Sequence, residues 1–220
     1  MQKFLTIVIN KILIRGEKTM NKIDNLKLYK DCLIIVDMLN GFVREGVLHD
    51  EEISKIIPKQ IKLIKEAKET KQLVIFIKDN HTKESTEFAR FGNTTHCLKG
   101  TSESEVVDEL KIYEQEKDTI SIEKNSTSFM EAHGFRKLLE RQTELETFNV
   151  IGCCTDICIT NGVLGLANYL DENNRRHNIN VYLDAIATYD EENRRDYVNA
   201  SKILLKQQGV NLINTKRKEK

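Results

Sequence analysis

The chain has 220 residues and a hydrophobic fraction of 40%, which fits one globular domain with a sizeable core and excludes a wholly disordered chain. It carries 34 Lys and Arg against 34 Asp and Glu, and this balance argues against nucleic-acid or anionic-membrane binding. Its five cysteines, three of them within residues 153–158, do not resemble a secreted disulfide framework, so we expect a cytoplasmic protein with reduced thiols.

The predicted domain begins after a leading segment. Residues 4–14 form an apolar run that is too short to span a bilayer, and no small-residue cleavage site follows it. Met20 is a second candidate start. We therefore expect residues 1–19 to be an extension or a misassigned start without ordered structure, with a membrane anchor as the alternative. Residues 20–215 would form one domain, and residues 216–220 a charged tail.

Strand-like and helix-like patterns alternate along the domain. Short apolar runs predict strands at residues 32–37, 73–77, 119–122, 148–152, 181–184 and 210–213. Apolar residues at helical spacing predict helices that begin at Pro58, and over residues 104–110, 135–139, 159–167 and 197–204. This alternation predicts an α/β fold with a doubly wound, mostly parallel sheet.

Residues with useful chemistry follow several of these strands. Asp37, Asp79 and Lys124 each come at or just after a strand end, and a glycine–cysteine run follows Ile151. Ligands of open α/β sheets bind beyond the carboxyl ends of the strands. We expect these side chains to converge at one edge of the sheet.

The segment Gly152-Cys-Cys-Thr-Asp-Ile-Cys-Ile159 leads from a predicted strand into a predicted helix. We interpret Thr155 as the N-cap, which places Cys158 in the first turn. There the helix dipole favours a thiolate, and free backbone N–H groups can bind an oxyanion. The alternative is that all three cysteines are small buried hydrophobic residues.

Other polar residues have both catalytic and ordinary interpretations. Asp37 could take a proton from a thiol, or cap a turn. Lys124 could lower the pKa of a thiol, or lie on the surface. Asp79, His81 and His96 are good ligand types for zinc, iron or manganese, although solvated loop residues of these types are common.

Taken together, Asp37, Lys124 and Cys158 resemble the catalytic Asp–Lys–Cys triad of the isochorismatase-like cysteine hydrolases. The resemblance covers residues 30–215 and includes the Thr155-Asp-Ile-Cys158 turn and the segment 184–190 after a later strand. It implies a single doubly wound domain with about six strands. It also implies an oxyanion hole formed by the backbone N–H groups of Cys154 and Cys158, and a cis peptide bond at Cys153–Cys154.

Within this family the chain resembles the nicotinamidase and pyrazinamidase branch, whose members add a metal site. Asp79, His81 and His96 match three of its ligands, and Glu87 matches the fourth, with Glu84 in reserve. The chain departs from the branch pattern at residues 92–95, where Gly-Asn-Thr-Thr replaces an aromatic residue and prolines. Phe42 and Phe91 match aromatic positions beside the substrate ring, with core packing as the alternative.

The resemblance implies hydrolysis of nicotinamide to nicotinate and ammonia through a thioester, with one divalent metal ion as cofactor. The alternatives are a metal-free cysteine amidase acting on another small amide or carbamoyl compound, and a non-catalytic binding protein on the same fold. The expected partner is a small-molecule amide, without nucleic acid or membrane, and a homo-oligomer is compatible with the sequence.

Overall fold

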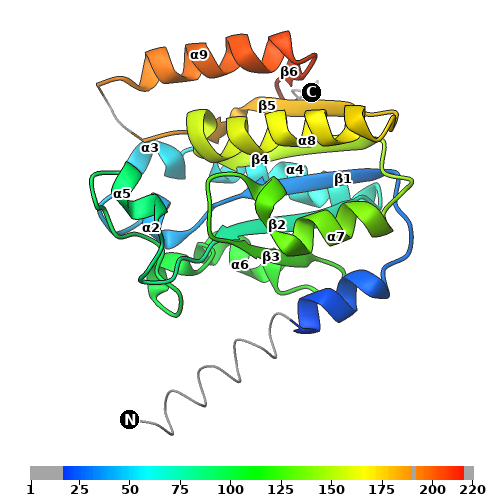
Figure 1. The fold of residues 1–220 in the computed structure, drawn as a ribbon, viewed down its shortest axis with the longest axis horizontal. Helices are drawn as coiled ribbons and strands as arrows, with labels where there is room; N and C mark the ends of the chain where they lie inside the picture. Colours follow the sequence, from blue (N-terminus) through cyan, green and yellow to red (C-terminus); the bar gives the residue numbers. More distant parts are fainter. Residues whose placement is uncertain (1–16, 190–191, 216–220) are drawn as a thin grey trace, which may run out of the picture.

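A six-stranded parallel sheet forms the centre of the computed structural model, which describes residues 17–189 and 192–215 (Figure 1). Its strands run side by side in the order β3-β2-β1-β4-β5-β6. Every pairing between neighbouring strands is parallel. Their bounds are β1 Asp31–Val36, β2 Leu73–Asp79, β3 Ile120–Lys124, β4 Thr147–Cys153, β5 Asn178–Ala187 and β6 Asn211–Ile213. The predicted doubly wound α/β fold is confirmed.

The central strands are apolar along their length because both faces of the sheet are covered. In β1, Cys32, Ile34 and Val36 pack on one face, and Leu33 and Ile35 pack on the other. The first face is covered by α7 (His133–Arg141) and α8 (Thr160–Glu172), and the second by α3 (Glu51–Ser54), α4 (Ile57–Glu69) and α6 (Asp108–Glu114). Helix α9 (Arg194–Gln207) lies along the β5–β6 side of the sheet (Figure 1). None of the helices in the described ranges is long and apolar enough to cross a membrane.

The strand order reverses direction between β1 and β4. From β1 the chain winds outward through β2 to β3, and then returns to place β4 on the other side of β1. Such a switch point leaves a crevice between the two strand ends, because the following segments leave in opposite directions. Asp37 follows β1 and Cys154 follows β4, so both residues lie at this crevice.

Two details differ from the sequence prediction. The predicted helix over residues 104–110 is wrong at its start: a 3₁₀ turn, η1 (Ser102–Ser104), precedes α6, and Glu105 is extended. The reason is backbone pairing with the segment after β1, since the N–H of Asn40 donates to Glu105 and the N–H of Val107 donates to Met38. The segment 184–190 does not start after a strand, because residues 184–187 belong to β5.

Three short helices were absent from the sequence prediction. They are α2 (Asn40–Val43), α3 and α5 (Glu87–Arg90), each of four residues. Such short helices contain too few residues for a helical period to stand out in the sequence. All three lie near the carboxyl ends of the strands (Figure 1), where α2 supplies Phe42 and α5 supplies Glu87 to the pocket described below.

The ends of the chain are described only in part. Residues 17–24 are helical, and the Thr19 hydroxyl donates to the backbone oxygen of Ser121 in β3. The expected extension covers residues 1–19, and its last three residues, 17–19, belong to this helix. Residues 1–16, Asp190 of the family-like segment and the charged tail at 216–220 lie outside the described residues.

The packing of α8 against the segment that follows β3 depends on Gly162. A Cβ atom at this position would lie 2.1 Å from the Phe129 ring, which belongs to η2 (Phe129–Glu131) and is fully buried. Gly165, one turn later, faces the flexible side chain of Met130, with a nearest distance of 3.1 Å to its Cγ. The two glycines thus lie on one helix but differ in the space around them.

We expect Gly162→Ala to destabilise the protein by about 1–3 kcal/mol, because overpacking against Phe129 outweighs the gain in helix propensity. Gly165→Ala should stay within about 1 kcal/mol of the wild type, because Met130 can move and alanine favours the helix. Urea unfolding of both variants measures this difference. Equal stability of Gly162→Ala and the wild type would contradict the packing described here.

Candidate active site

Cys158 lies in the turn that joins β4 to α8. This turn is a π-type turn, η3 (Thr155–Ile159), in which the N–H groups of Ile157 and Ile159 both donate to the Cys154 carbonyl, at 3.2 and 3.1 Å. Cys154 therefore occupies the N-cap position, and the prediction that Thr155 is the N-cap is wrong. The Thr155 side chain lies inside the turn, where its hydroxyl is buried without a hydrogen-bond partner. Cys158 is in the first turn, as expected.

Gly152 allows the end of β4 to approach β1 closely. Its φ is +127°, and a Cβ atom there would lie 2.1 Å from the Val36 carbonyl oxygen. This approach brings the Cys153 thiol to the main chain beyond β1, where it donates to the Asp37 carbonyl at 3.0 Å. The peptide bond between Cys153 and Cys154 is cis, as the family resemblance implies.

Asp37 is turned towards the neighbouring strand by its own backbone. Its φ of +50° interrupts the extended alternation of β1, and its N–H donates to Ile77 of β2 at 3.0 Å. The carboxylate then accepts a hydrogen bond of 2.8 Å from the N–H of Asp79. A side chain that simple alternation would direct elsewhere is therefore held at the ends of β1 and β2.

Lys124 joins Asp37, Asp79 and Cys158 into one buried group. The register of β2 and β3 pairs Lys124 with Asp79, and the ammonium contacts the Asp79 carboxylate directly. Its Nζ also lies 2.8 Å from Asp37 Oδ2 and 3.6 Å from Cys158 Sγ. Asp37, Lys124 and Cys158, which the sequence places 121 positions apart from first to last, thus meet at the predicted sheet edge.

The charges in this group shift one another's pKa values. Burial raises the pKa of Asp37 to about 7, the Asp79 carboxylate adds to the rise, and Lys124 opposes it. Burial alone would lower the pKa of Lys124, but Asp37 and Asp79 raise it well above its ordinary value. The ammonium is therefore retained at neutral pH.

Cys158 responds mainly to its burial. Burial raises the pKa of its thiol well above the ordinary value, Lys124 lowers it, and the two carboxylates raise it further. Lys124 thus lowers the thiol pKa, as predicted, but burial and the two carboxylates together raise this pKa by more. A neutral thiol beside a carboxylate whose pKa is about 7 can transfer its proton during a reaction.

A second group of four buried side chains lies next to the first and shares Asp79 with it. One ligand atom each from Asp79, His81, Glu87 and His96 lies within 4.8 Å of the others. The loop that carries Glu87 and His96 returns to Asp79 through a backbone bridge in which the His81 N–H donates to Cys97 and the Lys99 N–H to His81. Glu84, the reserve ligand, is exposed and outside this group.

The donor atoms of this group fit a cation. His81 Nε2 is buried without a hydrogen-bond partner, 3.5 Å from Asp79 Oδ1 and 3.8 Å from Glu87 Oε1. His96 Nε2 lies 4.0 Å from the same Glu87 oxygen. Two carboxylates and two imidazoles that face one another in buried space repel unless a proton or a metal ion lies among them. Their chemistry suits zinc, iron or manganese.

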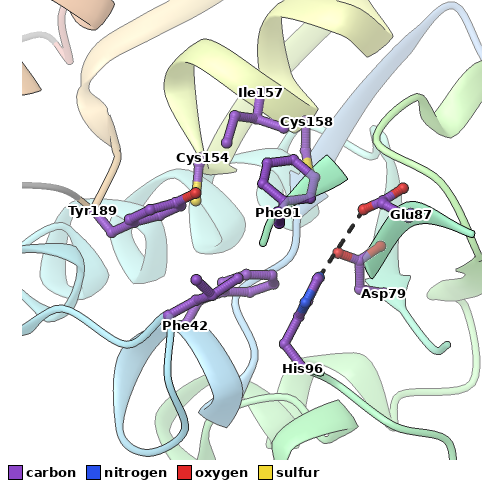
Figure 2. A pocket seen from close by; sticks show the side chains of 10 residues that line it. Phe42, Asp79, Glu87, Phe91, His96, Cys154, Ile157, Cys158 and Tyr189 are labelled. Carbon is purple, nitrogen blue, oxygen red and sulfur yellow. Dashed lines mark ion pairs between the residues drawn. The ribbon is translucent and has the colours of Figure 1, made fainter. Parts of the chain in front are cut away.

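Both groups open into one small cavity (Figure 2). Asp79, Glu87 and His96 line it on one side, and Cys158 and Cys154 on another. Its wall also contains the two predicted aromatic residues, Phe42 and Phe91, together with Leu48, Ile157 and Tyr189, which sequence reasoning missed. Tyr189 follows β5, so its position after a strand end was the available signal.

Comparison with known proteins agrees with this arrangement. A model of the isochorismatase domain matches residues 31–216. The chain belongs to the isochorismatase family. It is 32% identical over 142 residues to nicotinamidase 1 from Arabidopsis thaliana, a match that covers 58% of this chain and 56% of that protein.

Solved structures share the fold over most of the chain. N-carbamoylsarcosine amidase from Thermoplasma acidophilum matches with a TM-score of 0.68 and 26% identity, covering 87% of this chain and all of that one. Pyrazinamidase of Pyrococcus horikoshii, solved in complex with zinc, matches with a TM-score of 0.66 and 24% identity, covering 84% of this chain and 99% of that one. The family model thus shows the family, and these two amidases with different substrates share the fold.

The charges around Cys158 predict opposite shifts of its alkylation profile in two variants. Lys124→Met removes a cation, so the thiol pKa rises and alkylation by iodoacetamide needs a higher pH. Asp37→Asn removes an anion, so the pKa falls and alkylation begins at a lower pH. Peptide mapping by mass spectrometry follows labelling at Cys158 alone, and Cys153→Ala serves as the control with Cys158 left in place.

Two results bear on this prediction. Removing one partner of a buried ion pair costs about 3–5 kcal/mol, so melting temperatures must first show that each variant is folded at the assay temperature. If the two folded variants shift the profile in the same direction, or neither shifts it, the electrostatic arrangement described here is wrong.

Proposed function

We propose that this chain is a metal-dependent cysteine amidase that hydrolyses nicotinamide to nicotinate and ammonia. The observation that carries the proposal is that two neighbouring groups open into one small cavity with aromatic walls. They are the cysteine group (Asp37, Asp79, Lys124 and Cys158) and the ligand group (Asp79, His81, Glu87 and His96). In this proposal a single ring lies between Phe42 and Phe91, with its amide at Cys158 and its ring nitrogen towards the ligand group. The similarity to nicotinamidase 1 from Arabidopsis thaliana supports this choice of substrate.

In the first half of the reaction, Cys158 forms a bond to the amide carbon. Asp37 takes the thiol proton, and Sγ attacks the carbonyl, whose oxygen becomes an oxyanion. The backbone N–H groups of Cys154 and Cys158 would bind this oxyanion, and one such donor typically contributes about 3–4 kcal/mol. Asp37 then gives the proton to the amide nitrogen, the C–N bond breaks, and ammonia leaves behind a thioester.

In the second half, water replaces the sulfur. Asp37 takes a proton from the water, whose oxygen attacks the thioester carbonyl. The C–S bond then breaks, the acid leaves, and Cys158 regains its proton. Lys124 stays charged throughout, 3.6 Å from Sγ, where it stabilises negative charge on the sulfur and holds Asp37 in place.

Asp79, His81, Glu87 and His96 would hold one divalent ion at the side of the cavity. When bound, such an ion supplies a Lewis acid that can coordinate a ring nitrogen or polarise a water. The zinc in the pyrazinamidase of Pyrococcus horikoshii supports zinc as the first metal to test. The orphaned Nε2 of His81 supports the same position in this chain.

A second candidate is an amidase acting on a carbamoyl compound. It is favoured by the likeness to N-carbamoylsarcosine amidase, which extends over the full length of that protein at 26% identity. The cysteine chemistry would be the same, but the ligand group would have no substrate ring to bind. Metal dependence and substrate choice together separate the two candidates.

We expect the purified, untagged protein to contain about one equivalent of divalent metal and to release ammonia from nicotinamide. Chelation should abolish turnover, and zinc, iron or manganese should restore it. His81→Ala should lose the metal, whereas Glu84→Ala, a matched carboxylate on the same loop but exposed, should keep both metal and turnover. Metal-free protein that hydrolyses a carbamoyl compound but not nicotinamide would move the assignment to the second candidate.

A further inference from the structure

The two ring nitrogens of His81 face different surroundings. The ring is fully buried, with Nε2 towards Asp79 and Glu87 and without a hydrogen-bond partner. Its Nδ1 lies 3.0 Å from the side-chain oxygen of Asn125 and 3.4 Å from the Ser85 hydroxyl. Only one of the two nitrogens carries a proton in a neutral imidazole.

We propose that Asn125 sets the tautomer of His81, and thereby directs an unprotonated Nε2 at the metal position. The inference rests on the metal site of the proposed function. The Asn125 amide presents its oxygen, and not its NH₂ group, to Nδ1 at 3.0 Å, and an amide oxygen only accepts hydrogen bonds, so in this orientation the contact places the proton on Nδ1. The Ser85 hydroxyl can donate or accept, and therefore does not choose between the two tautomers.

The second imidazole of the ligand group, His96, also has an acceptor at Nδ1, but this acceptor belongs to the main chain. His96 Nδ1 lies 3.1 Å from the backbone oxygen of Thr94, which is also only an acceptor. This contact leaves the lone pair of His96 on Nε2, the nitrogen nearest Glu87. Both imidazoles then present an unprotonated Nε2 to the same space. For His96 the main chain fixes the tautomer, whereas for His81 a replaceable side chain does.

Asn125 reaches His81 because it directly follows Lys124 at the end of β3. The Lys124 carbonyl accepts the N–H of Asn80 at 2.9 Å, which holds this strand end beside the segment that carries His81. Lys124 then contacts Asp37 and Cys158, while Asn125 contacts His81. Consecutive residues of one strand end thus support the cysteine group and the ligand group.

Partners of this kind normally orient a metal-bound histidine and contribute to affinity. Their loss typically weakens metal binding about 10–100-fold. Asn125 is a positioning residue in this account, because it acts through His81 and does not touch the metal. Its effect should depend on the acceptor oxygen and not on the shape of the side chain.

Three variants of the full chain separate an effect of the acceptor oxygen from an effect of side-chain shape. Asn125→Leu keeps the approximate shape but removes the acceptor, and Asn125→Asp keeps an acceptor oxygen. Ser126→Ala is the neighbouring control, since its hydroxyl bonds only the backbone oxygen of Ser128 in the described structure. Zinc affinity is measured by competition with a chromogenic chelator, and melting temperatures confirm that each variant is folded.

The tautomer itself is read from nitrogen–proton correlation spectra of the metal-free protein with labelled histidine, at a pH high enough for the imidazole of His81 to be neutral. The His81 signals are identified by their absence in His81→Gln. In the wild type we expect the proton on Nδ1, and in Asn125→Leu a mixture of tautomers with zinc binding about 10–100-fold weaker. Asn125→Asp should keep the wild-type tautomer and bind zinc at least as tightly as the wild type, and Ser126→Ala should match the wild type.

The proposal is overturned if His81 carries its proton on Nε2 in the wild type. It is also overturned if Asn125→Leu binds zinc as tightly as the wild type, or if Asn125→Asp loses affinity to the same extent as Asn125→Leu. These results would leave the proposed amidase in place. A wild-type protein that takes up no zinc, iron or manganese would instead contradict the metal site of the proposed function.

Discussion

Lys124 is a cation with a fully buried side chain, and its neutralisation by Asp37 and Asp79 constrains the whole site. A buried ammonium is costly unless it is paired, and removing one partner of such a pair typically costs about 3–5 kcal/mol. The pairing fixes the ends of β1, β2 and β3 relative to one another. Because Cys158 lies 3.6 Å from the same ammonium, the proposed nucleophile is held within this arrangement as well.

The strand order makes this arrangement possible. The switch point between β1 and β4 places Asp37 and Cys158 at one crevice, and the register of β2 and β3 adds Asp79 and Lys124. Asp79 belongs to both the cysteine group and the ligand group. A metal ion at the second group would therefore act electrostatically on the first, so the two should be treated as one site.

The strands and the grouping of polar residues at their ends could be predicted from the sequence, because both depend on residues that are close together in the chain. Buried strands are visible as apolar runs, and residues at their ends share a sheet edge, so Asp37, Asp79 and Lys124 could be grouped without coordinates. The turn made Cys158 a candidate and the family resemblance then assigned it as the nucleophile, whereas Glu87 came from the family resemblance alone. The roles of these residues in catalysis and metal binding stay predictions.

The remaining features depend on contacts between distant segments. The choice of Thr155 as N-cap followed a local rule, whereas the π-type turn closes on the Cys154 carbonyl. Glu105 leaves the predicted helix because it pairs with the backbone of Asn40. Tyr189 lies in the family-like segment 184–190, which gave it no role of its own, and Asn125 has no motif; only the folded chain brings them to the cavity and to His81.

The most direct test of the account is to trap the acyl group that Cys158 should carry during turnover. The metal-loaded protein is mixed with nicotinamide, quenched in acid within the first turnover and digested for mass spectrometry. The account predicts a transient mass increase of one nicotinoyl group on the peptide that contains Cys158, and no turnover in Cys158→Ala. Undiminished turnover in Cys158→Ala, or an acyl group found on another residue, would contradict it.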